Sequence, residues 1–353
     1  MRQMIPLLCL FLCLCGSVSA QEKPQAQLHS DSVTIAQLTA RVEQVEQHNQ
    51  RWDRVVERLP KISGYVQLGY KYTDDLSSFF VKRARVSFAG ALASKLDYRL
   101  QIEFASPKIV DAFVRYRPFD ELGVQLGEYK LPFTIENTEY TPLNGEFVQD
   151  ALAMTYLVGL DDLCGVKSAG RDLGVMISGD FLPHGDHQIL SYNLGVFNGE
   201  GINTWDANKS KDVVGRLMVR PVAGLVLSGS YYWGEYGKEY IKRTRFSAGA
   251  CYDRGRVVVR SEYIGGTTKS LESGGWYAMG GIRATKSLLA AVRYDTFRHD
   301  RFDSQTRQTN YTAALTWLPI KYLRCQLDYT YTDFAMPSHP CGHAVSLLLT
   351  GMF

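Results

Sequence analysis

Arginine residues lie two positions apart in several short segments of the chain, and side chains of this type can bind anions. The guanidinium group is planar and stays charged, so it forms paired hydrogen bonds to phosphate or carboxylate groups. Alternate residues of a β-strand share one face, and this spacing therefore predicts rows of arginines on a common surface. The candidates for attracting anions are Arg83, Arg85, Arg99, Arg115, Arg117, Arg243, Arg245, Arg260, Arg293 and Arg324.

Acidic residues occupy alternate positions in the same segments and leave a second interpretation open. Asp97, Glu103 and Asp111 are examples. Opposite charges on neighbouring strands commonly pair and stabilise a strand face, so the common surface would then be electrically balanced. Because arginines form the majority, we predict a weak anion preference.

Histidine and cysteine residues offer few alternatives for chemistry. The segment 339–343 reads His-Pro-Cys-Gly-His and superficially resembles a set of metal ligands. A hydrolase needs a Ser-His or Asp-His constellation, and a zinc site needs three or four converging ligands, but no acidic cluster accompanies these residues. We therefore predict no catalytic residue, no metal site and no cofactor.

The elements that carry the arginines are predicted to be β-strands. From about residue 62 to the C-terminus, apolar and polar residues alternate in about sixteen short segments. The segment 95–104 is the clearest, with polar residues at odd positions and apolar residues at even positions. Connections between the segments are alternately short and long. We predict an all-β fold in which residues 61–353 form an antiparallel barrel of about sixteen strands.

The first twenty residues have the three parts of an export signal. Arg2 provides the positive start, residues 5–15 form a short apolar run, and Val18-Ser19-Ala20 supplies small residues at the cleavage site. No later segment has the length and apolarity of a transmembrane helix. An exported chain of ~10-residue alternating strands indicates a transmembrane barrel in the outer membrane of a Gram-negative cell. A formal net charge of +3 argues against nucleic acid as a partner.

Residues 21–60 are predicted to be a helical segment in the periplasm. Apolar residues recur there in alternating steps of three and four, which is typical of a coiled coil that joins copies of the chain. The predicted contact positions are Leu38, Val42, Val45, Asn49, Trp52 and Val56. Branched residues at one heptad position and Leu at the other favour two helices. The alternative is a single amphipathic helix packed against the barrel mouth.

Four segments of the chain resemble a known family. They are 79–90 (FFVKRARVSFAG), 97–104 (DYRLQIEF), 111–116 (DAFVRY) and 123–133 (GVQLGEYKLPF). Together they are similar to the phosphate-selective porins O and P, a family of sixteen-stranded, trimeric outer-membrane channels. The resemblance implies the same barrel and favours a trimer over a dimer.

In that family the third outer loop folds inward and narrows the pore. The resemblance places such a constriction loop at residues 131–171, the longest connection in this chain. Its candidate site residues are Glu136, Glu139, Asp150, Lys167 and Arg171. Acidic residues outnumber basic ones in this loop, whereas a phosphate filter needs positive charge at its narrowest point. The resemblance therefore predicts the fold more strongly than the choice of ion.

The expected function is a water-filled outer-membrane channel for passive diffusion of small hydrophilic solutes, weakly favouring anions such as phosphate. An uptake channel specific for an oligosaccharide or another nutrient is the main alternative, and a barrel hydrolase is less favoured. The expected partners are membrane lipid, small solutes and further copies of the chain.

Overall fold

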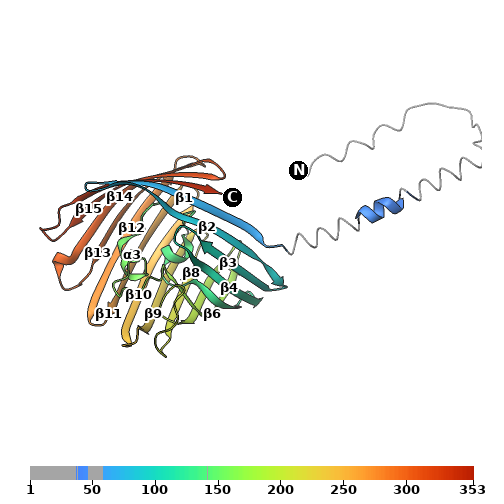
Figure 1. Ribbon diagram of the computed structural model, residues 1–353, viewed down its shortest axis with the longest axis horizontal. Helices are drawn as coiled ribbons and strands as arrows, with labels where there is room; N and C mark the ends of the chain where they lie inside the picture. Colours follow the sequence, from blue (N-terminus) through green and yellow to red (C-terminus); the bar gives the residue numbers. More distant parts are fainter. Residues whose placement is uncertain (1–36, 38, 47–58, 141) are drawn as a thin grey trace, which may run out of the picture. The chain divides into compact units, whose positions relative to one another are not determined.

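Sixteen strands form a closed antiparallel barrel in the computed structural model, which describes residues 37, 39–46, 59–140 and 142–353 (Figure 1). Each strand pairs with its neighbours in sequence, and the first strand pairs with the last. The strands are β1 (Lys61–Thr73), β2 (Ser77–Ala93), β3 (Leu96–Glu103), β4 (Lys108–Phe119), β5 (Leu122–Lys130), β6 (Arg171–His184), β7 (His187–Phe197), β8 (Asp212–Val219), β9 (Leu225–Tyr236), β10 (Ile241–Arg254), β11 (Val257–Thr268), β12 (Leu271–Arg283), β13 (Leu288–Arg298), β14 (Arg307–Ile320), β15 (Leu323–Phe334) and β16 (Gly342–Met352). The predicted all-β barrel of sixteen strands is confirmed.

The alternation of polar and apolar residues determines which face of each strand points inward. In β15, Arg324, Gln326 and Asp328 are buried, whereas Leu327 and Tyr329 are 41% and 45% exposed. A soluble protein would bury the apolar set, so this inverted pattern belongs to a barrel whose outside meets lipid.

A β-bulge in β2 changes this alternation at one place. Arg83 is opposite Gln67 of β1, and Val81 is opposite Leu68, so Lys82 is an extra residue in the pairing. A bulge re-aims the side chain that it carries. Lys82 donates a hydrogen bond to the carbonyl of Val148, and Arg83 donates one to Gln67 (3.0 Å). Two adjacent cations therefore reach the interior from one strand.

The connections at the two ends of the barrel differ in length. The end that carries the start of β1 and the end of β16 has turns of two to five residues. The opposite end has some connections as short as two residues and all of the long ones, and the longest of them, residues 131–170, joins β5 to β6. We call this segment the inner loop. It contains the short helices α2 (Ile135–Glu139) and α3 (Leu152–Leu157), and a 3-10 helix, η1 (Ser304–Thr306), lies in the connection between β13 and β14.

The segment before the barrel is a separate compact unit that ends at Leu59. Residues 39–46 are helical, and Val42 and Val45 are exposed. Leu38, Asn49, Trp52 and Val56 lie outside the described residues, as does the export signal at 1–20. The coiled coil therefore stays a prediction. Within the described part of the chain, no helix has the length and apolarity needed to span a membrane.

Candidate pore constriction

The inner loop lies inside the barrel, because its backbone is bound by side chains from the inner face of distant strands. The Ile135 N–H donates to Glu262 of β11 (2.8 Å). The Val148 N–H donates to Asp328 of β15 (2.6 Å). A third bond runs from the Leu152 N–H to Asp295 of β13 (3.0 Å). Inward carboxylates of the wall thus hold the loop at three points along its length.

Arginines of the wall bind the same loop. Each uses a charge-assisted hydrogen bond, which is stronger than a neutral one. The pairs are Arg260 with Glu146 (2.9 Å), Arg216 with Glu139 (2.9 Å), Arg245 with Asp162 (3.3 Å), Arg293 with the Gln149 carbonyl (2.9 Å) and Arg324 with the Gly145 carbonyl. Several arginines that the sequence suggested as anion-attracting are therefore engaged in anchoring the loop.

Apolar packing fixes one side of the inner loop to the wall. Its residues Leu131, Phe133, Leu152, Leu157 and Val158 belong to a buried cluster with Phe197, Tyr232, Ile264, Tyr277 and Phe297 of the wall. Burial of one such side chain stabilises the folded state by about 1.5–3 kcal/mol. The wall partners come from β7, β9, β11, β12 and β13, so this half of the barrel interior is filled.

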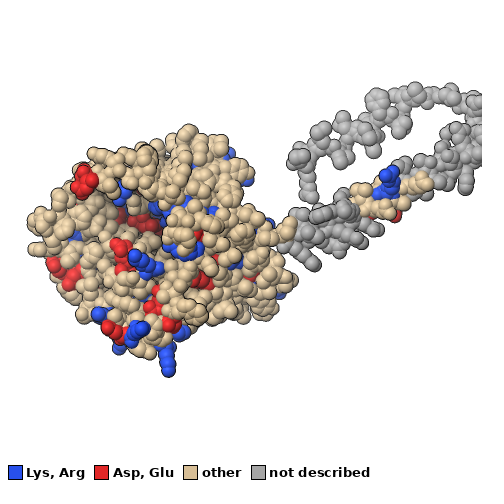
Figure 2. Space-filling view, in the orientation of Figure 1, with Lys and Arg blue, Asp and Glu red and all other residues tan. Residues whose placement is uncertain are grey.

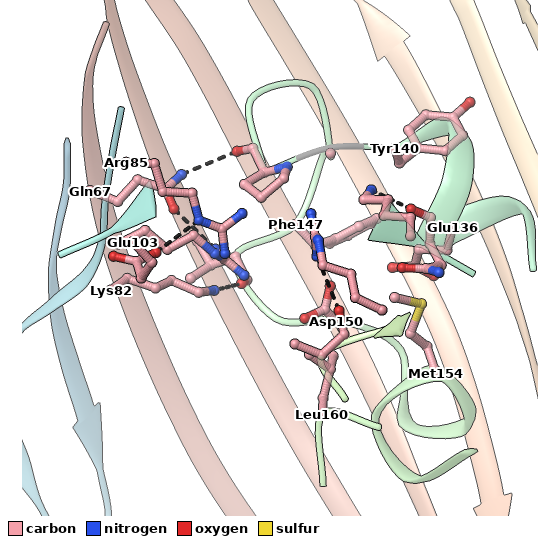
Figure 3. Close-up of a pocket in the computed structure, with 18 of the residues that line it drawn as sticks. Gln67, Lys82, Arg85, Glu103, Glu136, Tyr140, Phe147, Asp150, Met154 and Leu160 are labelled. Carbon is pink, nitrogen blue, oxygen red and sulfur yellow. Dashed lines mark hydrogen bonds and ion pairs between the residues drawn. The ribbon is translucent and has the colours of Figure 1, made fainter. Parts of the chain in front are cut away.

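The rest of the interior contains an opening of about 330 Å³ between the inner loop and strands β1 to β6, with Arg260, Gln326 and Leu348 of β11, β15 and β16 also in its lining (Figure 3). Its wall side is lined by Gln67, Lys82, Arg83, Arg85, Lys130 and Arg171. Its loop side is lined by Glu136, Tyr140, Phe147, Asp150 and Leu160. A solute that passes along the barrel at this level meets the wall on one side and the loop on the other.

Basic residues outnumber acidic ones around the opening. The lining includes eight Lys and Arg residues and four Asp and Glu residues. Arg85 pairs with Glu103 (2.8 Å), and Arg171 pairs with Asp111 (2.9 Å). Five other cations form no ion pair with a carboxylate in the described chain: Lys82, Arg83, Lys108, Lys130 and Lys167. Figure 2 shows basic and acidic side chains in the middle of the visible face of the barrel and along its lower edge.

The unpaired cations are held in place by neutral groups. Lys82 donates to the Val148 carbonyl, and Lys130 donates to the Asn137 carbonyl. Arg83 donates to Gln67, whose amide in turn donates to the Pro142 carbonyl (3.1 Å). Carbonyl dipoles fix the positions of these side chains without cancelling their charge. The wall side of the opening is therefore a positively charged surface.

Glu136 on α2 is the acidic residue whose ionisation is most affected by its surroundings. Burial raises the pKa of its carboxyl to about 7, and the nearby charges of Arg260 and Arg293 limit the rise. Its closest ion pair, to Arg293, spans 3.9 Å, and its Oε2 atom has no hydrogen-bond partner in the described structure. Near neutral pH the loop side of the opening is therefore only partly ionised at this position.

The structure separates the sequence-derived candidates into groups. Arg83, Arg85, Arg260, Glu136, Asp150, Lys167 and Arg171 line the opening. Arg245, Arg293, Arg324 and Glu139 anchor the loop but do not line the opening themselves.

Four further arginines also lie outside the lining of the opening, so only Arg83, Arg85 and Arg260 of the ten candidates line it, which corrects the expectation of one common surface. Arg115 pairs with Asp97 (3.1 Å), Arg99 lies 3.7 Å from Asp111, and Arg117 is exposed near the short-turn end of β4. Arg243 is bound by Asp212 and the Gly199 carbonyl (both 2.7 Å). Each of these arginines is on the strand face that the alternation predicts. Each lies at a different level along its strand from the opening and therefore does not line it.

Sequence reasoning missed Gln67, Lys82, Lys108 and Lys130 as lining residues. Lys82 is turned inward by the bulge, which depends on pairing with β1 and leaves no local signal. Lys130 follows Gly127, whose φ of +135° interrupts the regular alternation of β5.

The cysteine and histidine candidates form no site in the described structure. Cys164, Cys251, Cys325 and Cys341 are free thiols. His343 contacts the Tyr329 hydroxyl (2.8 Å), and no cluster of three potential ligands for a metal occurs among the described residues.

Known proteins with the same architecture are outer-membrane channels. A porin from Comamonas acidovorans, described as anion-selective, is 10% identical, with 83% of this chain and 99% of that chain covered at a TM-score of 0.64. OmpF of Salmonella typhi, solved with daunomycin, is 12% identical, with coverages of 84% and 98% and a TM-score of 0.65. The channel DcaP of Acinetobacter baumannii is 10% identical, with coverages of 83% and 97% and a TM-score of 0.58. At these identities the likeness establishes the fold.

The sequence itself gives the family. No curated protein matches the chain. The family model for phosphate-selective porin O and P matches residues 63–247, which is more than half of the chain and includes the inner loop. The chain therefore belongs to the phosphate-selective porin O and P family and is an outer-membrane channel protein.

Proposed function

We propose that this channel admits small hydrophilic solutes by diffusion and weakly favours anions, phosphate among them. The observation that carries the proposal is the group of cations without carboxylate partners on the wall side of the opening, which includes Lys82, Arg83 and Lys130. A surface that carries charge of one sign in a narrow passage raises the local concentration of oppositely charged solutes. Asp150 and partly ionised Glu136 on the loop side keep the preference weak.

Permeation assays test the diffusion part of this proposal. Liposomes that contain the purified protein should swell in isotonic solutions of small sugars and small organic anions, and faster with the anions when molecular size is matched. Large neutral oligosaccharides should enter slowly. A tight saturable preference for one oligosaccharide would instead support the nutrient-specific alternative.

The aromatic residues at the opening argue against that alternative. Sugar channels use exposed ring faces as stacking surfaces. The Tyr140 ring lies over Arg260 with 3.6 Å between the guanidinium carbon and the ring centroid, and the Phe147 ring lies over Arg293 at 4.5 Å. Cation–π contacts therefore occupy one face of each ring, which leaves only the other face as a stacking surface for a sugar.

The ion preference should depend on pH through Glu136. Its pKa of about 7 means that the carboxyl gains negative charge as pH rises from about 6 to about 8. The groups that face it are Arg260, Arg293, Asp150 and Glu262. One added charge changes the energy of a nearby ion by about 1 kcal/mol in water, so the anion-to-cation permeability ratio should fall by up to about fivefold. Reversal potentials recorded at both pH values measure this change.

The Glu136→Gln variant is the control for the pH dependence. Its anion-to-cation permeability ratio should change less between the two pH values than that of the parent protein. If the variant shows the same pH dependence as the parent protein, another group titrates and the role given to Glu136 is wrong.

The proposal includes a homo-oligomer, with a trimer favoured, joined in part by the heptad segment before the barrel. Val42 and Val45 are exposed on their helix, which leaves them available for other copies. The change Val42→Asp with Val45→Asp should remove about 1.5–3 kcal/mol per lost apolar contact. Light scattering in detergent should then show that the oligomer of the double variant dissociates at a higher protein concentration than the oligomer of a Gln44→Asp control. Equal oligomer masses on dilution of both variants would rule out the coiled coil.

A further inference from the structure

The outer face of the barrel has a groove that takes no part in the pore. It lies across β11 to β14, at the end of the barrel with the long connections, and has a volume of about 410 Å³. Tyr263, Trp276 and Tyr294 line it with their rings, and Trp276 and Tyr294 contact each other with ring centroids 5.0 Å apart. Aromatic residues on the outside of a barrel mark the boundary between the lipid tails and the headgroups.

A glycine gives this groove its depth. A side chain at Gly274 would place its Cβ 2.7 Å from the Tyr263 hydroxyl, which is closer than real contacts allow. Nearer the middle of β13, Val292 is 62% exposed and continues the outward apolar surface of the same strand. The groove therefore joins an aromatic floor to a face suited to an acyl chain.

Three arginines line the same groove. Arg298 and Arg307 are direct partners on β13 and β14, and Arg301 lies in the connection between them. Like charges directly opposite each other on neighbouring strands destabilise a sheet unless an anion lies between them. In the described structure no carboxylate pairs with Arg298.

The other two arginines have weak partners. Arg301 is 3.8 Å from Glu272, and Arg307 is 3.5 Å from Asp333, with all four side chains at least 36% exposed. Such exposed pairs contribute only about 0–1 kcal/mol. Their guanidinium groups are therefore available to a stronger anion, such as a phosphate monoester, which accepts paired hydrogen bonds.

We propose that this groove binds the phosphate-bearing headgroup of a glycolipid in the outer leaflet, with an acyl chain along Trp276. The three arginines lie just beyond the aromatic rings, at the level where lipid phosphates are found. A lipid supplies both the phosphate for the arginines and the chain for the apolar face, whereas free phosphate supplies only the first. The site is on the outside of the barrel, so the proposal of lipid binding does not depend on the proposed ion preference of the pore.

Native mass spectrometry of the detergent-purified protein tests this assignment with diphosphorylated lipid A as the probe. Each cation near a membrane surface contributes about 1 kcal/mol, or about fivefold in affinity. The triple change Arg298→Gln, Arg301→Gln and Arg307→Gln should therefore weaken binding by about tenfold or more. The single change Arg298→Gln should have a smaller effect in the same direction. Lipid A that has lost one phosphate should bind the parent protein more weakly.

The matched control is Arg256→Gln, which removes an exposed arginine at the opposite end of the barrel and should leave lipid binding unchanged. Equal binding by the parent protein and the triple variant would overturn the proposal. If inorganic phosphate competed with the bound lipid A as strongly as further lipid does, the ligand of the groove would be a free anion and not a lipid. A loss of oligomer mass in the triple variant would assign the groove to a second copy of the chain. Unchanged conductance in the triple variant is expected, because the pore is not touched.

Discussion

Replacing Lys82 and Arg83 with glutamate should abolish the anion preference and make the channel favour cations. Both side chains line the wall side of the opening and form no ion pair within the described chain. The double change alters the local charge by four units, and each unit is worth about 1 kcal/mol for an ion nearby in water. The anion-to-cation permeability ratio should therefore fall by at least about tenfold, as measured by reversal potentials in planar bilayers.

Two further variants distinguish an effect of the changed charge from an effect of a displaced inner loop. Lys82 also anchors the inner loop through Val148, so the double change could move the loop. Lys167 lines the opening without such a bond, and Lys167→Glu should shift the ratio in the same direction by a smaller amount. Arg117→Glu changes an exposed charge outside the lining and should have little effect. An unchanged ratio in both the double variant and Lys167→Glu would show that these cations do not select ions.

Removing the guanidinium of Arg260 should release part of the inner loop and raise the single-channel conductance. Arg260 and Glu146 form a 2.9 Å pair in which neither side chain is more than 3% exposed, and Tyr140 covers the guanidinium. Loss of one partner from a buried pair costs about 3–5 kcal/mol, because the other charge stays buried and unpaired. In Arg260→Ala, we expect residues near Glu146 to leave the wall and the current to become larger and noisier.

The controls for this change use the same physical argument. Replacing both partners with methionine leaves no buried charge, so Arg260→Met with Glu146→Met should keep a conductance close to that of the parent protein. Arg115 and Asp97 form an exposed pair at 3.1 Å, which contributes little, and Arg115→Ala should leave the conductance unchanged. Native conductance in Arg260→Ala would show that the pair does not hold the loop.

The barrel could be predicted from the sequence because its signal is local. Each strand carries its own alternation, such as that of residues 95–104, and membrane strands cannot leave this pattern without exposing charge to lipid. The inner loop could also be located, since a connection of this length is uncommon without a function. These features need no knowledge of which strands meet.

The arrangement of charges at the opening could not be predicted, because it depends on contacts between distant residues. Arg260 and Glu146 are 114 residues apart, and nothing near either residue indicates the pair. Lys82 points inward only because β2 has a bulge opposite Gln67. Alternation predicts which face of a strand an arginine occupies, but it does not predict the level of that arginine along the barrel axis. Arg117 and Arg83 therefore looked alike in the sequence, although only Arg83 lines the opening.

The sign of the reversal potential across a bilayer that contains the unmodified protein, in a gradient of potassium chloride at neutral pH, tests the central claim most directly. An excess of fixed positive charge beside the passage requires chloride to cross more readily than potassium. A potential of the opposite sign would mean that Glu136 and Asp150 dominate, and the assignment of the basic wall as the selective surface would be wrong.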